Sequence, residues 1–454
     1  MKKQTKINII VILFVILMIV LVYVKFQKDN DETSLIDEQT SSLFSNINSS
    51  TYASITKYIV YGTHLNFEGT IEITEISDIS VSNVNIILTN LDGQEQTVDA
   101  EFSYNDNQIS FSTTYEINGG INLDDLEISN YFIFLKVAFS NNETYYYSFQ
   151  NASDYRNIDY YTVTKNGSNN NVKIKFDTYN DKNYMGLFVS EADSLPDDVY
   201  DIVIDPGHGG TDSGNESDGY NEADLVLEVA TELQQLLEES GYKVLLTRDS
   251  SLSNYKDISD VYGDEGRVTI ANESNAKLLI SLHMDSNTYS LSSGGIEVYA
   301  PCNCDLTFAQ TLAKNLVSTA KASYSPLNSY KKYDGVYVHN FSSAEITALE
   351  NSAEKNGYEP YDVDTSTPYL YIIRETGGIA TNAYVDGRNE NYSANKYYDS
   401  NVGIESYLVE LGYIDIEDDL ENLLANQNLY AQAIFESIQS LYNSWIHSNI
   451  AKYS

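Results

Sequence analysis

The spacing of hydrophobic residues divides the chain into four parts. Residues 7–24 are apolar except for Asn8, and this length just spans a bilayer. Residues 27–52 are polar, acidic and aperiodic, as in a flexible linker. Short alternating runs fill residues 53–194, and strand signals alternate with helical periodicity from 195 to 454. The pattern predicts two folded domains behind an N-terminal anchor.

The first of these domains reads as all-β. In NYFIFLKVAFS, at 130–140, Ile133, Leu135 and Val137 fall on one side of an extended chain. Asp92-Gly93 is typical of a hairpin turn. Repeated strands with turn signals and no helical window indicate a β-sandwich, immunoglobulin-like in kind.

The second domain reads as an α/β fold with a largely parallel sheet flanked by helices. Its best-defined helix covers 222–239, with Asn221 as the N-cap and Gly241 at the end. The expected strands are 200–205, 242–248, 277–284, 295–300, 334–339, 369–374 and 405–413. The expected helices are 222–239, 265–274, 305–323 and two between 418 and 447.

The N-terminal segment predicts a single-pass membrane protein. Lys2, Lys3 and Lys6 precede the apolar run, and no small-residue cleavage site follows it. Residues 1–26 are therefore expected to form a transmembrane anchor with a short cytoplasmic N-terminus, which places the later domains outside the cytoplasm at the cell membrane. A cleaved form stays open.

The composition limits the classes of partner and metal site that the protein is expected to have. The chain has 26 Lys and Arg against 66 Asp and Glu, a formal net charge of −40. That charge repels phosphate backbones, so nucleic acid is excluded as an expected partner. Cys302 and Cys304 are too few for a zinc ribbon, and we assign them no role.

Two of the five histidines stand at strand ends, where ligand sites gather in α/β folds. His208 follows the run 202–204, and His283 ends the next long apolar run. Neutral imidazole is the commonest metal ligand, and a carboxylate as third ligand leaves one tetrahedral position for water. Glu222, at the start of the helix after the glycine-rich corner, is the best-placed carboxylate. Taken alone, an acidic residue there is better explained by the helix dipole than by metal binding.

A hydrolytic site also needs a group that moves protons. The strand ESYLVELGYI offers Glu405 and Glu410, which face opposite sides of an extended chain. Glu410 lies nearer the carboxyl end among apolar residues, where burial raises a carboxyl pKa. We therefore predict Glu410 as the general base.

These stretches resemble the zinc-dependent N-acetylmuramoyl-L-alanine amidases of the bacterial cell wall. The resemblance rests on five collinear segments: DPGHGGTDSG, NEADLVLEVATELQQLLEESGYKVLLTRD, RVTIANESNAKLLISLHMDSN, GGIEVY and ESYLVELGYI. It implies an α/β domain that uses a zinc-bound water to cut the amide between N-acetylmuramic acid and the L-alanine of the peptidoglycan stem peptide. It also implies Zn²⁺ held by His208, Glu222 and His283, with Glu410 as the catalytic glutamate.

The chain departs from the family pattern in two places. Asp415 occupies the flank after VELG, and roughly a hundred residues separate GGIEVY from ESYLVELG, which indicates an insertion at about 323–400. Within it, Ser342 and Glu345 predict a capping box and a helix over 342–356. In some relatives an inserted helix blocks the zinc site until an activator protein displaces it, and the same is a hypothesis here.

Three alternatives stay open at this point. Arg374 is a candidate substrate-binding residue, although a structural salt bridge explains it equally well. The protein could be a catalytically silent wall-binding or regulatory protein built on an amidase domain. It could also be a zinc peptidase that cuts a different bond.

Overall fold

The computed structural model describes residues 47–73, 80–90, 92–151, 158–163, 169–179, 182–191, 197–249, 263, 265–357, 360, 363–377 and 402–453. The predicted membrane span at 7–24 lies outside these residues, as do the first part of the linker and the end of the insertion. Within the described residues, no helix is long and apolar enough to cross a membrane.

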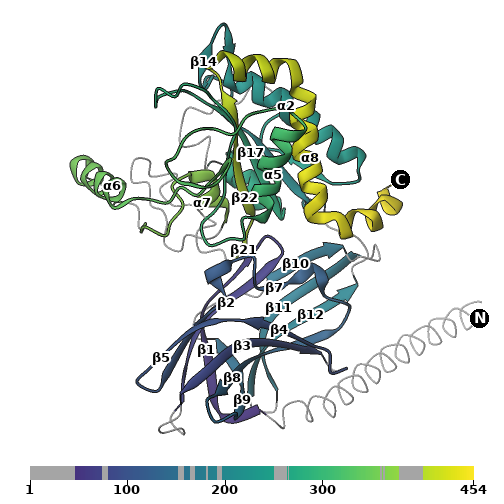
Figure 1. Cartoon of the computed structure of the whole chain (residues 1–454). Helices are drawn as coiled ribbons and strands as arrows, with labels where there is room; N and C mark the ends of the chain where they lie inside the picture. Colours follow the sequence, from purple (N-terminus) through teal and green to yellow (C-terminus); the bar gives the residue numbers. More distant parts are fainter. Residues whose placement is uncertain are drawn as a thin grey trace, which may run out of the picture.

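The N-terminal part is built from strands, which form the lower body in Figure 1. Its central path runs β10-β11-β12-β8-β9-β1-β2-β6-β5, with β3 and β4 paired beside β8. The strands are β1 Ile47–Tyr61, β2 His64–Glu72, β3 Val81–Asn90, β4 Glu95–Asp99, β5 Glu101–Asn105, β6 Gln108–Ser112, β7 Ile121–Asn122, β8 Asn130–Phe139, β9 Thr144–Asn151, β10 Ile158–Val163, β11 Asn169–Tyr179 and β12 Lys182–Glu191, with 3-10 turns η1 Thr114–Glu116 and η2 Leu123–Asp125.

The sequence pattern accounts for this part in outline. Ile133, Leu135 and Val137 are fully buried on β8, and the hairpin at Asp92-Gly93 joins β3 to β4. The predicted linker was too long, because residues 47–52 belong to β1, whose first residues pair with Tyr146 and Tyr147 of β9. An immunoglobulin-like connectivity stays a prediction.

The C-terminal part contains a mixed sheet in the order β16-β13-β17-β22-β18-β20-β19. The pairs β16/β13, β13/β17, β17/β22 and β18/β20 are parallel, whereas β18/β22 and β19/β20 are antiparallel. The strands are β13 Ile202–Pro206, β16 Val244–Leu246, β17 Leu278–Asp285, β18 Glu297–Tyr299, β19 Lys331–Tyr333, β20 Val336–Tyr337 and β22 Glu405–Tyr413; β14 Glu216–Ser217 and β15 Tyr220–Asn221 form a separate hairpin.

Helices cover both faces of this sheet. One apolar cluster joins the sheet to α2 Glu222–Glu239, α5 Thr307–Ser318 and α8 Glu417–Tyr453, and another joins its other face to α4 Arg267–Glu273 and α7 Tyr371–Gly377. Helix α2 has the predicted bounds, and the Asn221 side chain accepts from the Asp224 N–H. The three-layer arrangement positions the carboxyl ends of β13 and β17 beside the start of α2.

Two predicted elements were wrong. Residues 369–374 were expected as a strand, but Arg374 N–H donates to the Leu370 carbonyl and Thr376 Oγ1 to that of Ile372, as in a helix. The two helices expected between 418 and 447 are the single helix α8, because Leu423 and Tyr430 are buried on either side of its polar centre and the partly buried Leu424 and Leu429 pack against the same apolar cluster.

The two parts meet at the end of the sheet opposite the carboxyl ends of β13, β17 and β22 (Figure 1). There β21 Val402–Gly403 pairs in parallel with β1, and Gly62 N–H donates to the Gly403 carbonyl. Lys277, which directly precedes β17, places its Nζ 3.0 Å from Asp124 Oδ1 of η2, and both side chains are largely buried. A buried ion pair and a shared strand therefore join the two parts.

The insertion contains the predicted helix, α6 Ser343–Asn356, with a complete Ser342–Glu345 capping box. In Figure 1 α6 protrudes sideways from the α/β part, well apart from the β14–β15 hairpin that leads into Glu222. This arrangement does not support the hypothesis that the helix covers the predicted metal ligands.

Candidate metal and catalytic site

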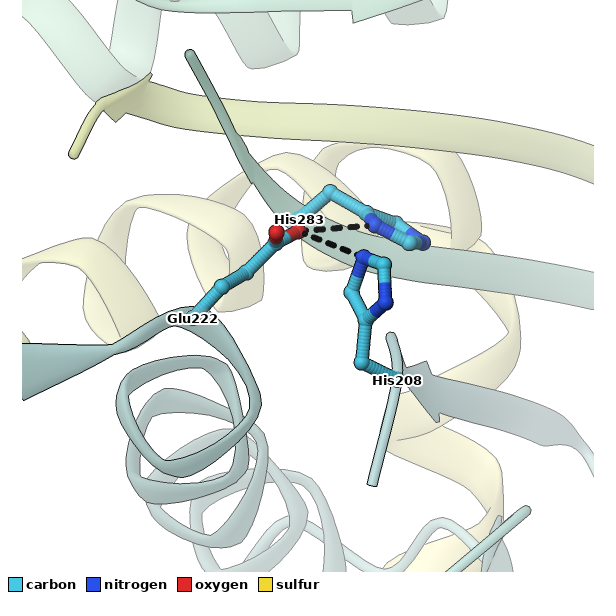
Figure 2. Close-up of side chains that lie close together, drawn as sticks. All are labelled: His208, Glu222 and His283. Carbon is cyan, nitrogen blue, oxygen red and sulfur yellow. Dashed lines mark hydrogen bonds and ion pairs between the residues drawn. The ribbon is translucent and has the colours of Figure 1, made fainter. Parts of the chain in front are cut away.

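The three predicted metal ligands come together at the carboxyl end of the sheet. In Figure 2 the Glu222 carboxylate faces both imidazoles, and a dashed line joins it to each ring. Its Oε1 is 3.1 Å from His208 Nε2 and 3.0 Å from His283 Nδ1. The three ligand atoms lie within 4.8 Å of one another, the only such group of three or more among the described residues.

The chain turns sharply to present His208. This residue follows β13 with a left-handed φ of 58°, and the Gly207 N–H donates to the Leu282 carbonyl of β17. A side chain at Gly207 would collide with the His283 ring, since a Cβ there would lie 2.3 Å from Cε1. Glycine at 207 therefore lets the two histidines approach each other.

Glu222 is the most enclosed of the three residues, with 1% of its side chain exposed. Its Oε2 accepts from the backbone and side-chain nitrogens of Asn215, and its Oε1 accepts from the Met284 N–H. Burial alone would raise the pKa of Glu222, but its bonds to the two histidines lower it overall. The carboxylate is thus held ionised and fixed in orientation.

A carboxylate behind His208 completes its orientation. Asp212 Oδ2 lies 2.9 Å from His208 Nδ1, which leaves Nε2 to face Glu222. Histidines that bind metals usually donate their second N–H to such a partner. Burial would lower the pKa of His208, but bonds to Glu222 and Asp212 raise it instead.

Two buried arginines donate hydrogen bonds to the backbone of the turn that presents His208. Arg248 donates to the carbonyls of Pro206 and Gly207, and Arg267 donates to the His208 carbonyl and to Asp205 Oδ1. Both arginines therefore shape the site and are not positioned to react.

Glu410 lies beside the metal group, on β22, in register with His283 of β17. Its Oε2 is buried and has no hydrogen-bond partner in the described part of the chain. Burial, and then the charges of Glu222, Asp285 and Glu297, raise the pKa of Glu410 well above its usual value of 4.5. A carboxyl group of this kind takes up a proton more readily than an exposed glutamate does.

The structure separates Glu405 and Arg374 from this group. Glu405 lies at the opposite end of β22, 5% exposed, and accepts from Tyr407. Arg374 is buried in α7, where it donates to Glu375 and to the carbonyls of Pro368 and Tyr369. These contacts favour a structural role for Arg374. Substrate binding by Arg374 stays a prediction.

Sequence reasoning missed the residues that support the ligands. Asp212 and Asn215 lie four and seven positions after His208, a spacing that fits many surface loops and carries no signal of its own. Glu297 in GGIEVY was also unassigned; it is fully buried, accepts from Tyr299 and Tyr413, and is the antiparallel neighbour of Glu410.

Two histidines and a carboxylate, with a separate buried carboxyl group beside them at the strand ends of an α/β sheet, are typical of a metal-dependent hydrolase. A family model described as N-acetylmuramoyl-L-alanine amidase matches residues 202–440, more than half of the chain. The chain belongs to this family.

Individual relatives match parts of the chain. An uncharacterized cell wall amidase of Bacillus anthracis is 24% identical over 255 residues, 56% of this chain and 37% of that protein. The germination-specific N-acetylmuramoyl-L-alanine amidase of Bacillus subtilis is 34% identical over 112 residues, 23% of this chain and 47% of that protein. The chain thus spans less than half the length of either relative.

Among solved structures, the N-acetylmuramoyl-L-alanine amidase from Clostridium difficile 630 is similar at 20% identity and a TM-score of 0.35, over 54% of this chain and 98% of that one.

Proposed function

We propose that this protein is a zinc-dependent hydrolase that cuts the amide bond between N-acetylmuramic acid and the L-alanine of the peptidoglycan stem peptide. The observation that carries the proposal is the convergence of His208, Glu222 and His283 beside Glu410, in a chain that belongs to the amidase family.

The donor set fits zinc. Zinc ligands at 2.0–2.1 Å in a tetrahedron lie about 3.3 Å from one another. Glu222 Oε1 lies at nearly that separation from both imidazole nitrogens, 3.1 and 3.0 Å. Two imidazoles and a carboxylate also leave the fourth position free for water or substrate. When bound, zinc supplies a Lewis acid that polarises a carbonyl and acidifies water.

The residues of the chain then carry out the proton transfer and hold the ligands in position. Glu410 accepts a proton from the attacking water and returns it to the nitrogen of the departing L-alanine. Its Oε2, buried and without a hydrogen-bond partner among the described residues, and its raised pKa suit the uptake of a proton during the reaction. Asp212 and Asn215 keep His208 and Glu222 in place while this occurs.

The test is digestion of purified peptidoglycan by the full chain with zinc, alongside Glu410→Gln, with products identified by mass spectrometry. We expect free stem peptides that begin with L-alanine, and a loss of at least a hundredfold in rate for Glu410→Gln with zinc still bound. Glu421→Gln, on the exposed side of α8, is the matched control and should keep full activity.

Other products would redirect the proposal. Cleavage at another bond would indicate a zinc peptidase. Zinc binding without any release would favour a wall-binding or regulatory protein, and an active Glu410→Gln variant would remove Glu410 from the mechanism.

We also propose that the protein is anchored in the cell membrane by residues 7–24, with its hydrolytic part outside the cytoplasm. The support is the apolar run with Lys2, Lys3 and Lys6 before it. Deleting residues 1–26 should move the protein from the membrane fraction to the soluble fraction; an unchanged distribution would contradict the anchor. An activator protein stays a prediction.

A further inference from the structure

Exposed tyrosines are frequent in one stretch of the α/β part, and three of them, Tyr289, Tyr330 and Tyr369, lie near one another. Six of its exposed large side chains are tyrosines between residues 289 and 371, at 36–55% exposure: Tyr289, Tyr324, Tyr330, Tyr333, Tyr369 and Tyr371. Scattered exposed hydrophobic residues need no explanation, but a cluster of aromatic ones indicates a binding surface.

Part of this cluster is a column of stacked rings at the base of the insertion. The His339 ring lies between Tyr330 and Tyr369, with centroid distances of 3.6 and 4.2 Å and nearly parallel planes. Phe341 meets the edge of Tyr369 at 5.1 Å, and the Arg374 guanidinium lies over Phe341 at 5.5 Å. The buried end is therefore fixed by Arg374, and Tyr330 forms the other end.

Tyr330 is held in place before any ligand arrives. Its φ is 62°, a left-handed conformation that is costly for a bulky residue. One ring face packs on His339, and 36% of the residue remains exposed. A rigid aromatic face of this kind loses little entropy when a ligand stacks on it.

The surface lies to one side of the catalytic group. Tyr330 directly precedes β19, and the order β22-β18-β20-β19 places that strand three neighbours from the strand of Glu410, about 14 Å across the sheet at ~4.8 Å per strand. The registers of these strands place Tyr330 a few residues toward the amino end of β22 relative to Glu410. Tyr289 follows β17, the strand of His283. Burial raises the pKa of Tyr330, and the nearby groups Glu345, Tyr289 and Tyr369 add to the effect.

The chemistry of this surface fits a sugar better than a charged or aliphatic ligand. Tyrosine offers a flat apolar face with a hydroxyl at its rim, which matches the apolar face and hydroxyl rim of a pyranose ring. An N-acetylated sugar is neutral, so the net charge of −40 does not repel it.

We propose that Tyr330 binds the glycan strand of the substrate by stacking on a sugar unit beyond the muramic acid whose amide is cut. The His339–Tyr369 stack supports the Tyr330 ring, and Tyr289 extends the surface. This inference rests on the proposed function for the identity of the polymer, but the binding itself needs no hydrolysis.

The experiment measures binding of the full chain to glycan strands from which stem peptides have been removed, and hydrolysis of two substrates: long peptidoglycan strands and a single disaccharide-peptide. The principal variant is Tyr330→Asn, because asparagine tolerates the left-handed backbone and lacks the ring. Tyr330→Phe keeps the stacking face. Tyr115→Ala, at an exposed tyrosine of the β part, is the matched control.

We expect Tyr330→Asn to weaken glycan binding and to raise KM on long strands about five- to tenfold, with the disaccharide-peptide unaffected and Tyr330→Phe close to wild type. Wild-type binding to bare glycan that Tyr330→Asn weakens, without release of peptide by either protein, would support this surface while contradicting the proposed hydrolysis. The inference is overturned if wild type does not bind bare glycan, if Tyr330→Asn binds it normally, or if that variant loses activity on both substrates equally.

Discussion

Gly207→Ala isolates the close approach of the two histidines. Gly207 does not have a left-handed φ, so alanine there introduces no backbone strain and the change acts through its methyl group alone. The new Cβ would lie 2.3 Å from Cε1, 2.5 Å from Nε2 and 2.6 Å from Nδ1 of His283.

The size of the expected loss in zinc affinity follows from these distances. An ordinary carbon contact is about 3.5 Å, so the His283 ring must move by about 1 Å. The backbone cannot yield easily, because Gly207 N–H is bonded to the Leu282 carbonyl at 2.9 Å. Displacing a metal ligand by this amount should lower zinc affinity about 100-fold.

The assay is zinc titration of the full chain in competition with a chromophoric chelator, supported by the rise in melting temperature that zinc produces. Gly119→Ala is the control, since it also lacks a left-handed φ and its Cβ would meet only atoms of Glu116 in the β part, the nearest being the carbonyl oxygen at 3.1 Å. Zinc affinity of Gly207→Ala within threefold of wild type would refute the reasoning, because the ring would then have room that the structure does not show.

Three further outcomes follow from the same structure. Asp212→Asn should lower zinc affinity about tenfold in the same titration, because it removes the carboxylate behind His208; unchanged affinity would mean that the contact does not orient the ring. Burial raises the pKa of Glu405 to about 7 from 4.5, so the stability linked to its protonation is present below pH 4.5 and lost as pH rises through about 7. Glu405→Gln should therefore raise the free energy of unfolding at pH 8, by roughly 3 kcal/mol at most, and leave it unchanged at pH 4, as measured by denaturant unfolding. An equal gain at both pH values would show that titration of Glu405 is not the cause. Asp124→Ala should destabilise the chain by about 3 kcal/mol in denaturant unfolding, because it leaves Lys277 buried without that carboxylate, whereas Asp334→Ala at the exposed Lys331 pair should change it by less than about 1 kcal/mol; similar losses from both would show that burial of the first pair does not matter.

The sequence by itself determined the elements whose signals are local. Helix α2 has its predicted bounds because an apolar stripe, the Asn221 cap and Gly241 all lie within one window. The capping box of α6 is equally local. The metal group was predictable for a different reason: parallel strands end at one edge of a sheet, so residues that follow β13 and end β17 must meet there.

Tertiary structure decided whatever depends on distant partners. Ile372 and Ile373 favour a strand locally, yet α7 is a helix because both side chains bury against the sheet. Residues 47–52 read as linker until β9 pairs with them. The raised pKa of Glu410 has charges from three other elements among its causes, and the Tyr330–His339–Tyr369 stack joins residues up to 39 positions apart. No short stretch of sequence contains both partners of such contacts. These contacts therefore stabilise the local structure only after the chain has folded, and sequence patterns do not reveal them.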